Sequence, residues 1–277
     1  MDWKRLLIGN WNWKRPFISL ASIYLILAVT ACSFADKLIF QPPPSSYTTG
    51  LDGFEMIKPT ETEPIALVHL KASPGAPTLL YSHGNAEDIG QNMEIFREWQ
   101  ARGFGVIAYD YPGYGLSPGS STEASTQETI RHVWDHAITS GISPSSMVIV
   151  GRSIGSGPSL WLASSVDSAG IILISPLKSV YTTAFPLPFP LFPGDRFPNL
   201  RRIRKIETPL LVIHGENDKV IPASHGRAIH ENSPSNKKSF VSIQDAGHND
   251  LFVVGAEEIF IKTSAFISEV SAKGNTR

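Results

Sequence analysis

The sequence predicts an α/β domain in which a mostly parallel sheet carries helices on both faces. Short apolar runs alternate with longer segments of helical periodicity from residue 78 to residue 271. One run, Met-Val-Ile-Val at residues 147–150, is apolar throughout, which is typical of a parallel strand buried on both faces. A Gly-x-Ser-x-Gly turn follows it at residues 151–155, directly before a segment rich in small residues. Together these observations predict one α/β domain at residues 49–277.

The first forty residues differ from the rest of the chain. An uncharged, apolar stretch occupies residues 17–35, and at about 1.5 Å per residue it is just long enough to cross a bilayer core of ~30 Å as a helix. Basic residues precede it, namely Lys4, Arg5, Lys14 and Arg15. We therefore expect residues 1–40 to form an uncleaved signal anchor, with the domain on the non-cytoplasmic side of a membrane.

Two alternatives to this anchor stay open. Val29-Thr30-Ala31-Cys32 resembles the lipobox of bacterial lipoproteins, in which the cysteine becomes the acylated first residue. The long charged leader and the long apolar run are unusual for such a signal. A buried core helix is the other alternative. Because Cys32 is the single cysteine, an intramolecular disulfide and a cysteine-rich metal site are excluded.

The remaining elements follow in order after a proline-rich linker at residues 41–48. Apolar residues at 54–57 and 65–70 predict an opening antiparallel pair of strands. The alternating part then predicts strands at 78–82, 106–111, 147–150, 170–175, 209–215 and 239–244, and helices at 88–102, 123–140 and 256–271.

An insertion at residues 177–206 interrupts the alternation. Prolines recur every two or three residues from 186 to 193, which excludes a regular helix or a central strand. At this position the insertion would lie over the carboxyl edge of the sheet, where ligands bind in open α/β folds. We expect a lid or acyl-chain wall that includes Phe185, Phe189 and Phe192; a loop packed on the core is the alternative.

Ser153 is the candidate nucleophile. A serine hydroxyl reacts only when it is held exposed beside a base, and a tight strand-to-helix turn presents it in that way. The backbone N–H of Ile154, at the start of the following helix, would then point at the oxyanion. Ser117 lies in a second Gly-x-Ser-x-Gly pattern, but Pro118 stands where the donor is needed and has no N–H.

His248 is the candidate base because it follows a predicted strand and precedes the last helix. For the acid we choose Asp218, in the loop after strand 209–215, over the rivals Glu216 and Asp250. The loop at residues 83–88 is expected to supply the second oxyanion donor, the backbone N–H of Asn85; orientation of the loop by the Asn85 side chain is the alternative. The other histidines are expected to be structural or solvated, among them His69, His132 and His136 within predicted elements and His225 and His230 on a surface-like helix.

Several motifs give the chain from residue 67 to residue 271 a resemblance to the α/β-hydrolase superfamily. They are Ser82-His83-Gly84-Asn85-Ala86, Tyr109-Asp110-Tyr111, Gly113-Tyr114-Gly115, Ser153-Ile154-Gly155, Ser175-Pro176-Leu177, Ala184-Phe185-Pro186, Val212-Ile213-His214-Gly215 and Gly247-His248-Asn249-Asp250. Within the superfamily, the chain resembles the membrane-associated serine hydrolases that include the eukaryotic protein depalmitoylases. That resemblance implies Ser153, Asp218 and His248 as nucleophile, acid and base. Those enzymes carry a cysteine-rich acylated N-terminus, which this chain lacks.

The expected function is therefore that of a membrane-anchored serine hydrolase. It would cleave an acyl ester or thioester, from a lipid or an acylated protein, through an acyl-enzyme on Ser153, with no metal and no organic cofactor. A formal net charge of −1, without blocks of like charge, gives no general attraction to nucleic acid. The alternatives are an aminopeptidase-like amidase of the same fold and a catalytically silent binding module.

Overall fold

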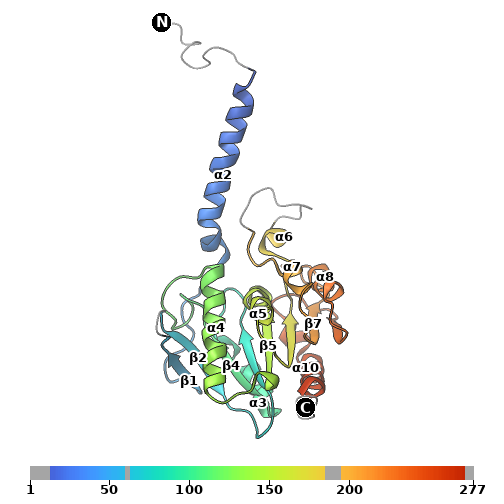
Figure 1. The fold of residues 1–277 in the computed structure, drawn as a ribbon. Helices are drawn as coiled ribbons and strands as arrows, with labels where there is room; N and C mark the ends of the chain where they lie inside the picture. The colour runs from blue at the N-terminus through green and yellow to red at the C-terminus, as the bar shows by residue number, and fades with distance from the viewer. Residues whose placement is uncertain (1–12, 60–62, 185–194, 272–277) are drawn as a thin grey trace.

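One eight-stranded sheet organises the computed structural model, which describes residues 13–59, 63–184 and 195–271 (Figure 1). The strand order is β1-β2-β4-β3-β5-β6-β7-β8. Strands β1 and β2 pair antiparallel, as do β2 and β4, and all other neighbours are parallel. This confirms the predicted α/β fold. The strands are β1 Phe54–Ile57, β2 Ile65–Leu70, β3 Thr78–Ser82, β4 Gly105–Tyr109, β5 Met147–Arg152, β6 Gly170–Ile174, β7 Leu210–Gly215 and β8 Lys238–Ile243.

Helices cover both faces of the sheet, and each face has its own apolar core. Leu80 and Ile149 belong to the core under α4 and α5, whereas Tyr81 and Val150 belong to the core under α3 and α10. Neighbouring residues of a strand point to opposite faces, so a run that is apolar throughout supplies both cores. Figure 1 shows α4 and α5 in front of the sheet. The helices after the N-terminal one are α3 Met93–Ala101, α4 Glu123–Thr139, α5 Ser156–Ala163, α6 Val180–Ala184, α7 Asn199–Ile203, α8 Ser224–Asn232, α9 Leu251–Val254 and α10 Ala256–Ser271.

Several predicted boundaries differ from those in the structure, and two of these differences have a visible cause. The helix predicted at residues 88–102 begins at Met93, because a 3₁₀ turn at Gly90–Asn92 precedes it. The strand predicted at residues 106–111 ends at Tyr109. The Asp110 side chain accepts a hydrogen bond from the Ile89 N–H at 3.0 Å, so the chain leaves the sheet there to make polar contacts.

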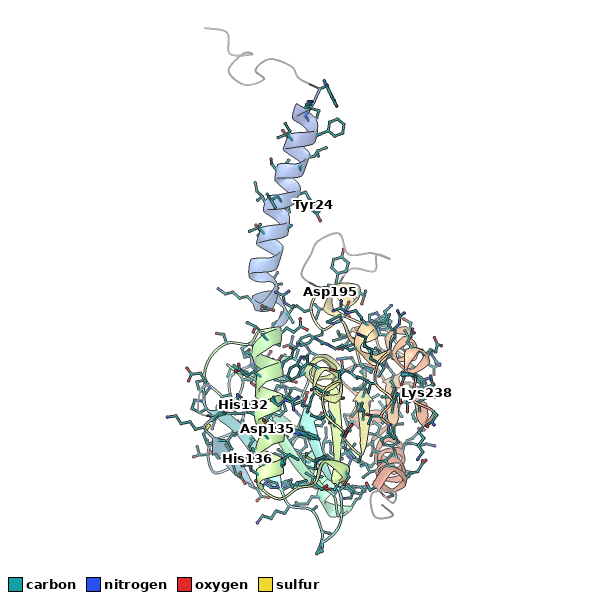
Figure 2. The ribbon with its side chains drawn as sticks, viewed as in Figure 1. Tyr24, His132, Asp135, His136, Asp195 and Lys238 are labelled. Carbon is teal, nitrogen blue, oxygen red and sulfur yellow. The ribbon has the colours of Figure 1, made fainter. Side chains whose placement is uncertain are left out.

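The N-terminal helix α2 (Arg15–Ile39) projects away from the domain (Figures 1 and 2). Many of its large apolar side chains are exposed: Phe17, Ile18, Leu20, Ile23, Tyr24, Leu25, Ile26, Leu27 and Val29. In residues 13–59, 63–184 and 195–271, no helix combines the length and the apolar character that crossing a membrane requires. The expected spanning anchor at residues 17–35 therefore gains no support. The side chains of Arg15 and of residues 31–34, which include Cys32, lie outside the described part.

The chain between α2 and β1 packs on the domain. Tyr47 is buried and its hydroxyl donates to the Asp110 carboxylate, while the Ser46 hydroxyl donates to Asp88. The Phe40 ring meets the Phe197 ring edge-on, with centroids 6.1 Å apart. The proline-rich segment thus fixes the base of α2 to the domain surface.

The structure describes both ends of the predicted insertion at residues 177–206. Helices α6 and α7 lie there, and Phe197 is fully buried at a left-handed φ of 51°. Phe185, Phe189 and Phe192 lie outside the described residues. The acyl-chain wall expected from these three residues stays a prediction.

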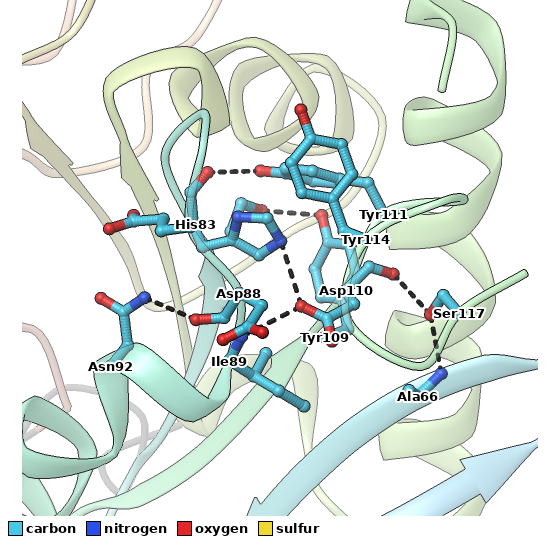
Figure 3. Close-up of polar contacts among 12 residues, drawn as sticks. Ala66, His83, Asp88, Ile89, Asn92, Tyr109, Asp110, Tyr111, Tyr114 and Ser117 are labelled. Carbon is cyan, nitrogen blue, oxygen red and sulfur yellow. Dashed lines mark hydrogen bonds and ion pairs between the residues drawn. The ribbon is translucent and has the colours of Figure 1, made fainter. Parts of the chain in front are cut away.

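Ser117 joins β2 to the loop that follows β4 (Figure 3). Its buried hydroxyl accepts from the Ala66 N–H at 2.9 Å and donates to the Asp110 carbonyl oxygen at 3.1 Å. The single hydroxyl proton is thus donated to a backbone carbonyl and not to a base, so this serine lacks the arrangement that activates a nucleophile. The structure therefore gives Ser117 a structural position, in line with the sequence interpretation.

The first prediction is that Ser117→Ala lowers the free energy of unfolding by about 1 to 3 kcal/mol, because a buried donor and acceptor lose their partner. Urea denaturation measures the change. Ser145→Ala is the matched control, since that hydroxyl is exposed and is hydrogen-bonded to another exposed hydroxyl, that of Ser143, at 2.9 Å. Equal midpoints for both variants would contradict the structural assignment of Ser117.

Candidate active site

Ser153 sits at a constrained turn between β5 and α5. Its φ is 53°, a left-handed conformation that costs energy for a residue with a Cβ. The turn fits only because its glycines are small: a Cβ on Gly155 would lie 2.2 Å from the Ser82 carbonyl oxygen, and one on Gly151 would lie 2.7 Å from the Gly155 carbonyl oxygen. The close approach presses the turn at residues 151–155 against the end of β3 and fixes the direction of the serine side chain.

The structure brings Ser153, His248 and Asp218 together at the carboxyl edge of the sheet. The Ser153 Oγ lies 3.0 Å from the His248 Nε2, and the His248 Nδ1 lies 2.7 Å from the Asp218 Oδ2. Ser153 follows β5, Asp218 follows β7, and His248 follows β8. An Nδ1–H donated to the carboxylate leaves Nε2 unprotonated, so that it accepts the serine proton.

Asp218 is held as a carboxylate by its surroundings. Its Oδ1 accepts the N–H groups of Val220 at 2.9 Å and Ile221 at 2.7 Å. Burial alone would raise the pKa of Asp218, but hydrogen bonds from His214, His248 and the Ile221 N–H outweigh it and hold the pKa well below the ordinary 3.8. The group stays ionised beside the imidazole.

The two rival acids lie elsewhere. Glu216 is exposed, and Asp250 accepts the Gly247 N–H at 2.6 Å, so its carboxylate shapes the histidine loop from within. Sequence reasoning gave His214 no role beyond the motif. Its buried Nε2 lies 2.8 Å from the Ile221 carbonyl oxygen and 3.3 Å from the Asp218 carboxylate. A histidine ending a buried strand four residues before an aspartate was the available signal.

The loop at residues 83–88, named the oxyanion loop after the role expected of it, lies against Ser153. A Cβ placed on Gly84 would lie 3.6 Å from the Ser153 Cβ. Within the described part of the chain, the backbone N–H of Asn85 has no hydrogen-bond acceptor, so it is available to a ligand. The Ile154 N–H lies at the start of the 3₁₀ turn that leads into α5.

A largely buried ion pair that the sequence did not reveal braces this loop. Glu87 accepts the Gly84 N–H with one carboxylate oxygen and pairs with Arg152 through the other. Their side chains are only 15% and 14% exposed. Arg152 immediately precedes Ser153, so the pair links the oxyanion loop to the candidate nucleophile. A charged residue inside an otherwise apolar turn was the signal, because a buried guanidinium needs a partner.

His83 is buried and supports the same loop (Figure 3). Its Nδ1 lies 2.7 Å from the Gly84 carbonyl oxygen, its Nε2 lies 3.4 Å from Asp110, and its own carbonyl oxygen accepts the Tyr111 hydroxyl at 2.6 Å. Burial lowers the pKa of His83, but the hydrogen bond to Asp110 and the charge of Asp110 outweigh this effect. The pKa of His83 is therefore raised above its ordinary value. His83 therefore serves the loop as a polar brace.

Two further observations concern the remaining histidines. His225, expected on a surface-like helix, is buried, which corrects that prediction; burial and the Lys178 charge lower its pKa to about 4. Within the described residues, one group of three side chains has metal-ligand potential, formed by Glu55, His69 and His136 with ligand atoms within 4.8 Å of one another. Glu55 contacts both imidazoles directly, and these contacts explain why the three side chains lie together. Figure 2 shows His136 at the end of α4 away from α2.

Comparison with known proteins places this geometry in a family. Residues 77–197 match the model of the alpha/beta hydrolase fold, and residues 198–252 match that of serine aminopeptidase, S33. The chain belongs to the α/β-hydrolase family. It is similar to alpha/beta hydrolase domain-containing protein 17B of Homo sapiens, with 39% identity over 203 residues, 72% of this chain and 70% of that protein.

Solved structures show the same fold at much lower identity. An esterase of Pyrococcus furiosus aligns with a TM-score of 0.68 and 16% identity, covering 83% of this chain and 98% of that one. Alpha/beta hydrolase domain-containing protein 10 from mouse aligns with a TM-score of 0.63 and 15% identity, covering 79% and 99%. The protein is thus a hydrolase of this fold, as the resemblance in its motifs implied.

The second prediction concerns the pH dependence of stability. A carboxylate whose pKa is lowered by folding stabilises the protein above its unfolded pKa, and this stabilisation is lost as the pH falls. Asp218→Asn should therefore be less stable than the parent by a constant amount above about pH 5, and the gap should narrow as the pH falls below about 4. Urea denaturation at several pH values measures it.

Glu216→Gln is the matched control, because Glu216 is an exposed carboxylate in the same loop. That variant should follow the parent at every pH. A gap between parent and Asp218→Asn that is the same at pH 3 and pH 7 would contradict the lowered pKa of Asp218.

Proposed function

We propose that this protein is a serine hydrolase that cleaves an acyl ester or thioester through an acyl-enzyme on Ser153. The observation that carries the proposal is the continuous hydrogen-bonded chain from the Ser153 Oγ through the His248 imidazole to the Asp218 carboxylate. Such a chain activates a hydroxyl that is otherwise a weak nucleophile.

The proposed reaction has two halves. The Ser153 Oγ passes its proton to the His248 Nε2 and attacks the acyl carbonyl carbon, and the N–H groups of Asn85 and Ile154 bind the resulting oxyanion. The intermediate collapses with loss of the alcohol or thiol, which takes the proton from His248. Water, activated by the same Nε2, then releases the acid and restores Ser153. Asp218 holds the imidazole tautomer and stabilises its charged form.

An acylated lipid or an acylated protein is the proposed substrate class. Two features support this substrate class. The first is the similarity to alpha/beta hydrolase domain-containing protein 17B, and the second is the set of motifs shared with the group that includes the protein depalmitoylases. Phe185, Phe189 and Phe192 are proposed to bind the acyl chain. Burial of each further methylene would stabilise binding by about 0.8 kcal/mol.

The third prediction tests the nucleophile. Ser153→Ala should abolish both hydrolysis and labelling by a fluorophosphonate, because neither an acyl group nor the probe then has an oxygen to bond to. Ser117→Ala, the other serine in a Gly-x-Ser-x-Gly pattern, should keep both.

The acid is tested in the same assays. Asp218→Asn should lower kcat by about 10⁴-fold. Activity and the preference for acyl-chain length are measured with esters and thioesters of C4, C8 and C16 acids, below their micelle-forming concentrations.

Labelling that survives in Ser153→Ala and disappears in Ser117→Ala would refute the assignment. A fully active Asp218→Asn, with loss in Glu216→Gln or Asp250→Asn, would move the acid to that rival.

An aminopeptidase-like amidase is the second candidate, because residues 198–252 match the serine aminopeptidase model. It uses the same nucleophile and base but expels an amine. Peptide anilides compared with thioesters of the same acyl group distinguish the two candidates. A binding module without catalysis would show neither hydrolysis nor covalent labelling.

We also propose that α2 attaches the protein to a membrane. The proposal is supported by the row of exposed apolar side chains on a helix that projects from the domain. Exposed apolar surface of this extent is unusual in a protein surrounded by water on all sides. The basic residues that precede the helix predict a domain on the non-cytoplasmic side.

The fourth prediction is that the double substitution Ile23→Ser and Leu27→Ser moves a large share of the protein from the membrane fraction to the soluble fraction, because it removes two exposed apolar side chains from α2. Val253→Ser is the matched control, since Val253 is an apolar residue 84% exposed on the domain. Unchanged fractionation of the double variant would refute attachment through α2. Release by Cys32→Ser alone would favour the lipoprotein alternative.

A further inference from the structure

We propose that the Asn85 side chain is a positioning residue that makes the base of α2 part of the oxyanion hole. The inference rests on the proposed function, because it concerns the N–H group that would bind the oxyanion. It goes beyond that function in assigning a role in turnover to a segment outside the α/β sheet.

Both ends of the Asn85 amide are used. Its Nδ2 donates to the Ile39 carbonyl oxygen at 2.6 Å, and its Oδ1 accepts the Gln41 N–H at 3.1 Å and the Tyr114 hydroxyl at 2.6 Å. The Gln41 N–H also contacts the Tyr114 hydroxyl oxygen, at 2.9 Å. One side chain therefore holds the last residue of α2, the second residue after the helix and the loop that follows β4.

These bonds fix the middle of a loop whose two ends are held by Glu87 and Asp88. The Gly84 N–H is fixed by Glu87, while the next residue but one, Ala86, is exposed and has a left-handed φ of 56°. The Asn85 N–H lies between these two points, and its backbone makes no hydrogen bond through that N–H within the described residues. Its direction is therefore set by the side chain of the same residue.

A second contact ties the base of α2 to the chain that leads into α7. The Arg196 Nε donates to the Asp36 carboxylate at 2.9 Å, and both side chains are mostly buried. Phe197, the next residue, packs on α5, where a Cβ on Gly157 would lie 2.2 Å from its ring. The base of α2 is thus bonded to the oxyanion loop and to the chain that packs behind the nucleophile.

Oxyanion donors act on the transition state more strongly than on the bound substrate. If the Asn85 side chain positions the donor, its loss lowers kcat and leaves KM nearly unchanged. Loss of a complete donor typically lowers turnover by about 10²- to 10³-fold, so a misdirected donor should cost at least about tenfold.

The experiment measures kcat and KM of the full chain for a soluble thioester in the parent, Asn85→Ala and Asn232→Ala. Asn232 is the matched control: its amide also bonds in both directions, to the Ala228 carbonyl oxygen at 2.9 Å and to Arg204 at 3.1 Å, in α8. We expect Asn85→Ala to lose at least about tenfold in kcat with KM within about twofold, and Asn232→Ala to equal the parent.

Gln41→Pro provides a second variant, because it removes the backbone N–H that bonds to Asn85 and leaves the loop sequence intact. It should show the same loss in kcat, and it decides the question if Asn85→Ala does not fold. An unchanged kcat, or a raised KM with unchanged kcat, would overturn the inference. Parent protein that neither hydrolyses thioesters nor labels at Ser153 would instead refute the proposed function.

Discussion

The close approach of Gly155 to the Ser82 carbonyl oxygen is the contact on which the site depends. With a side chain at Gly155, the turn after β5 would have to move away from the end of β3. Because the two meet, Ser153 lies against the oxyanion loop that continues from β3, and its strained φ of 53° is maintained by packing on both sides. The parallel sheet supplies the remaining geometry: β7 and β8 end at the same edge and deliver Asp218 and His248 to the same point.

Buried carboxylates organise the surroundings of this contact, and each is matched by donors. Asp218 holds the imidazole, Glu87 joins the oxyanion loop to the residue before the nucleophile, and Asp110 collects the Ile89 N–H, the Tyr47 hydroxyl and His83. A buried charge without such partners would cost several kcal/mol. The hydrogen-bond donors that compensate these charges also fix the loops in place. The same contacts therefore stabilise the buried charges and set the geometry of the site.

The sequence predicted the features that depend on a few neighbouring residues, but it did not predict the contacts between distant segments. The strands, the turn at Ser153 and the loops carrying Asp218 and His248 follow from patterns within a few residues, and the structure places them as predicted. Asn85 was assigned a backbone role with a side chain free to orient its loop. Its partner in α2 lies 46 residues away, and no local pattern reports such a pairing. The buried state of His225 was missed for the same reason, since helical periodicity does not show what packs against a helix.

The central claim is that Ser153 carries the acyl group during turnover, and mass spectrometry of the intact protein tests it most directly. Rapid quenching of the full chain with a C16 thioester should reveal a mass increase of one acyl group, and peptide mapping should place that group on Ser153. His248→Gln should show little or no adduct, because the base that takes the proton of Ser153 is missing. An acyl group mapped to Ser117, or steady hydrolysis with no adduct on Ser153 at any quench time, would contradict the account.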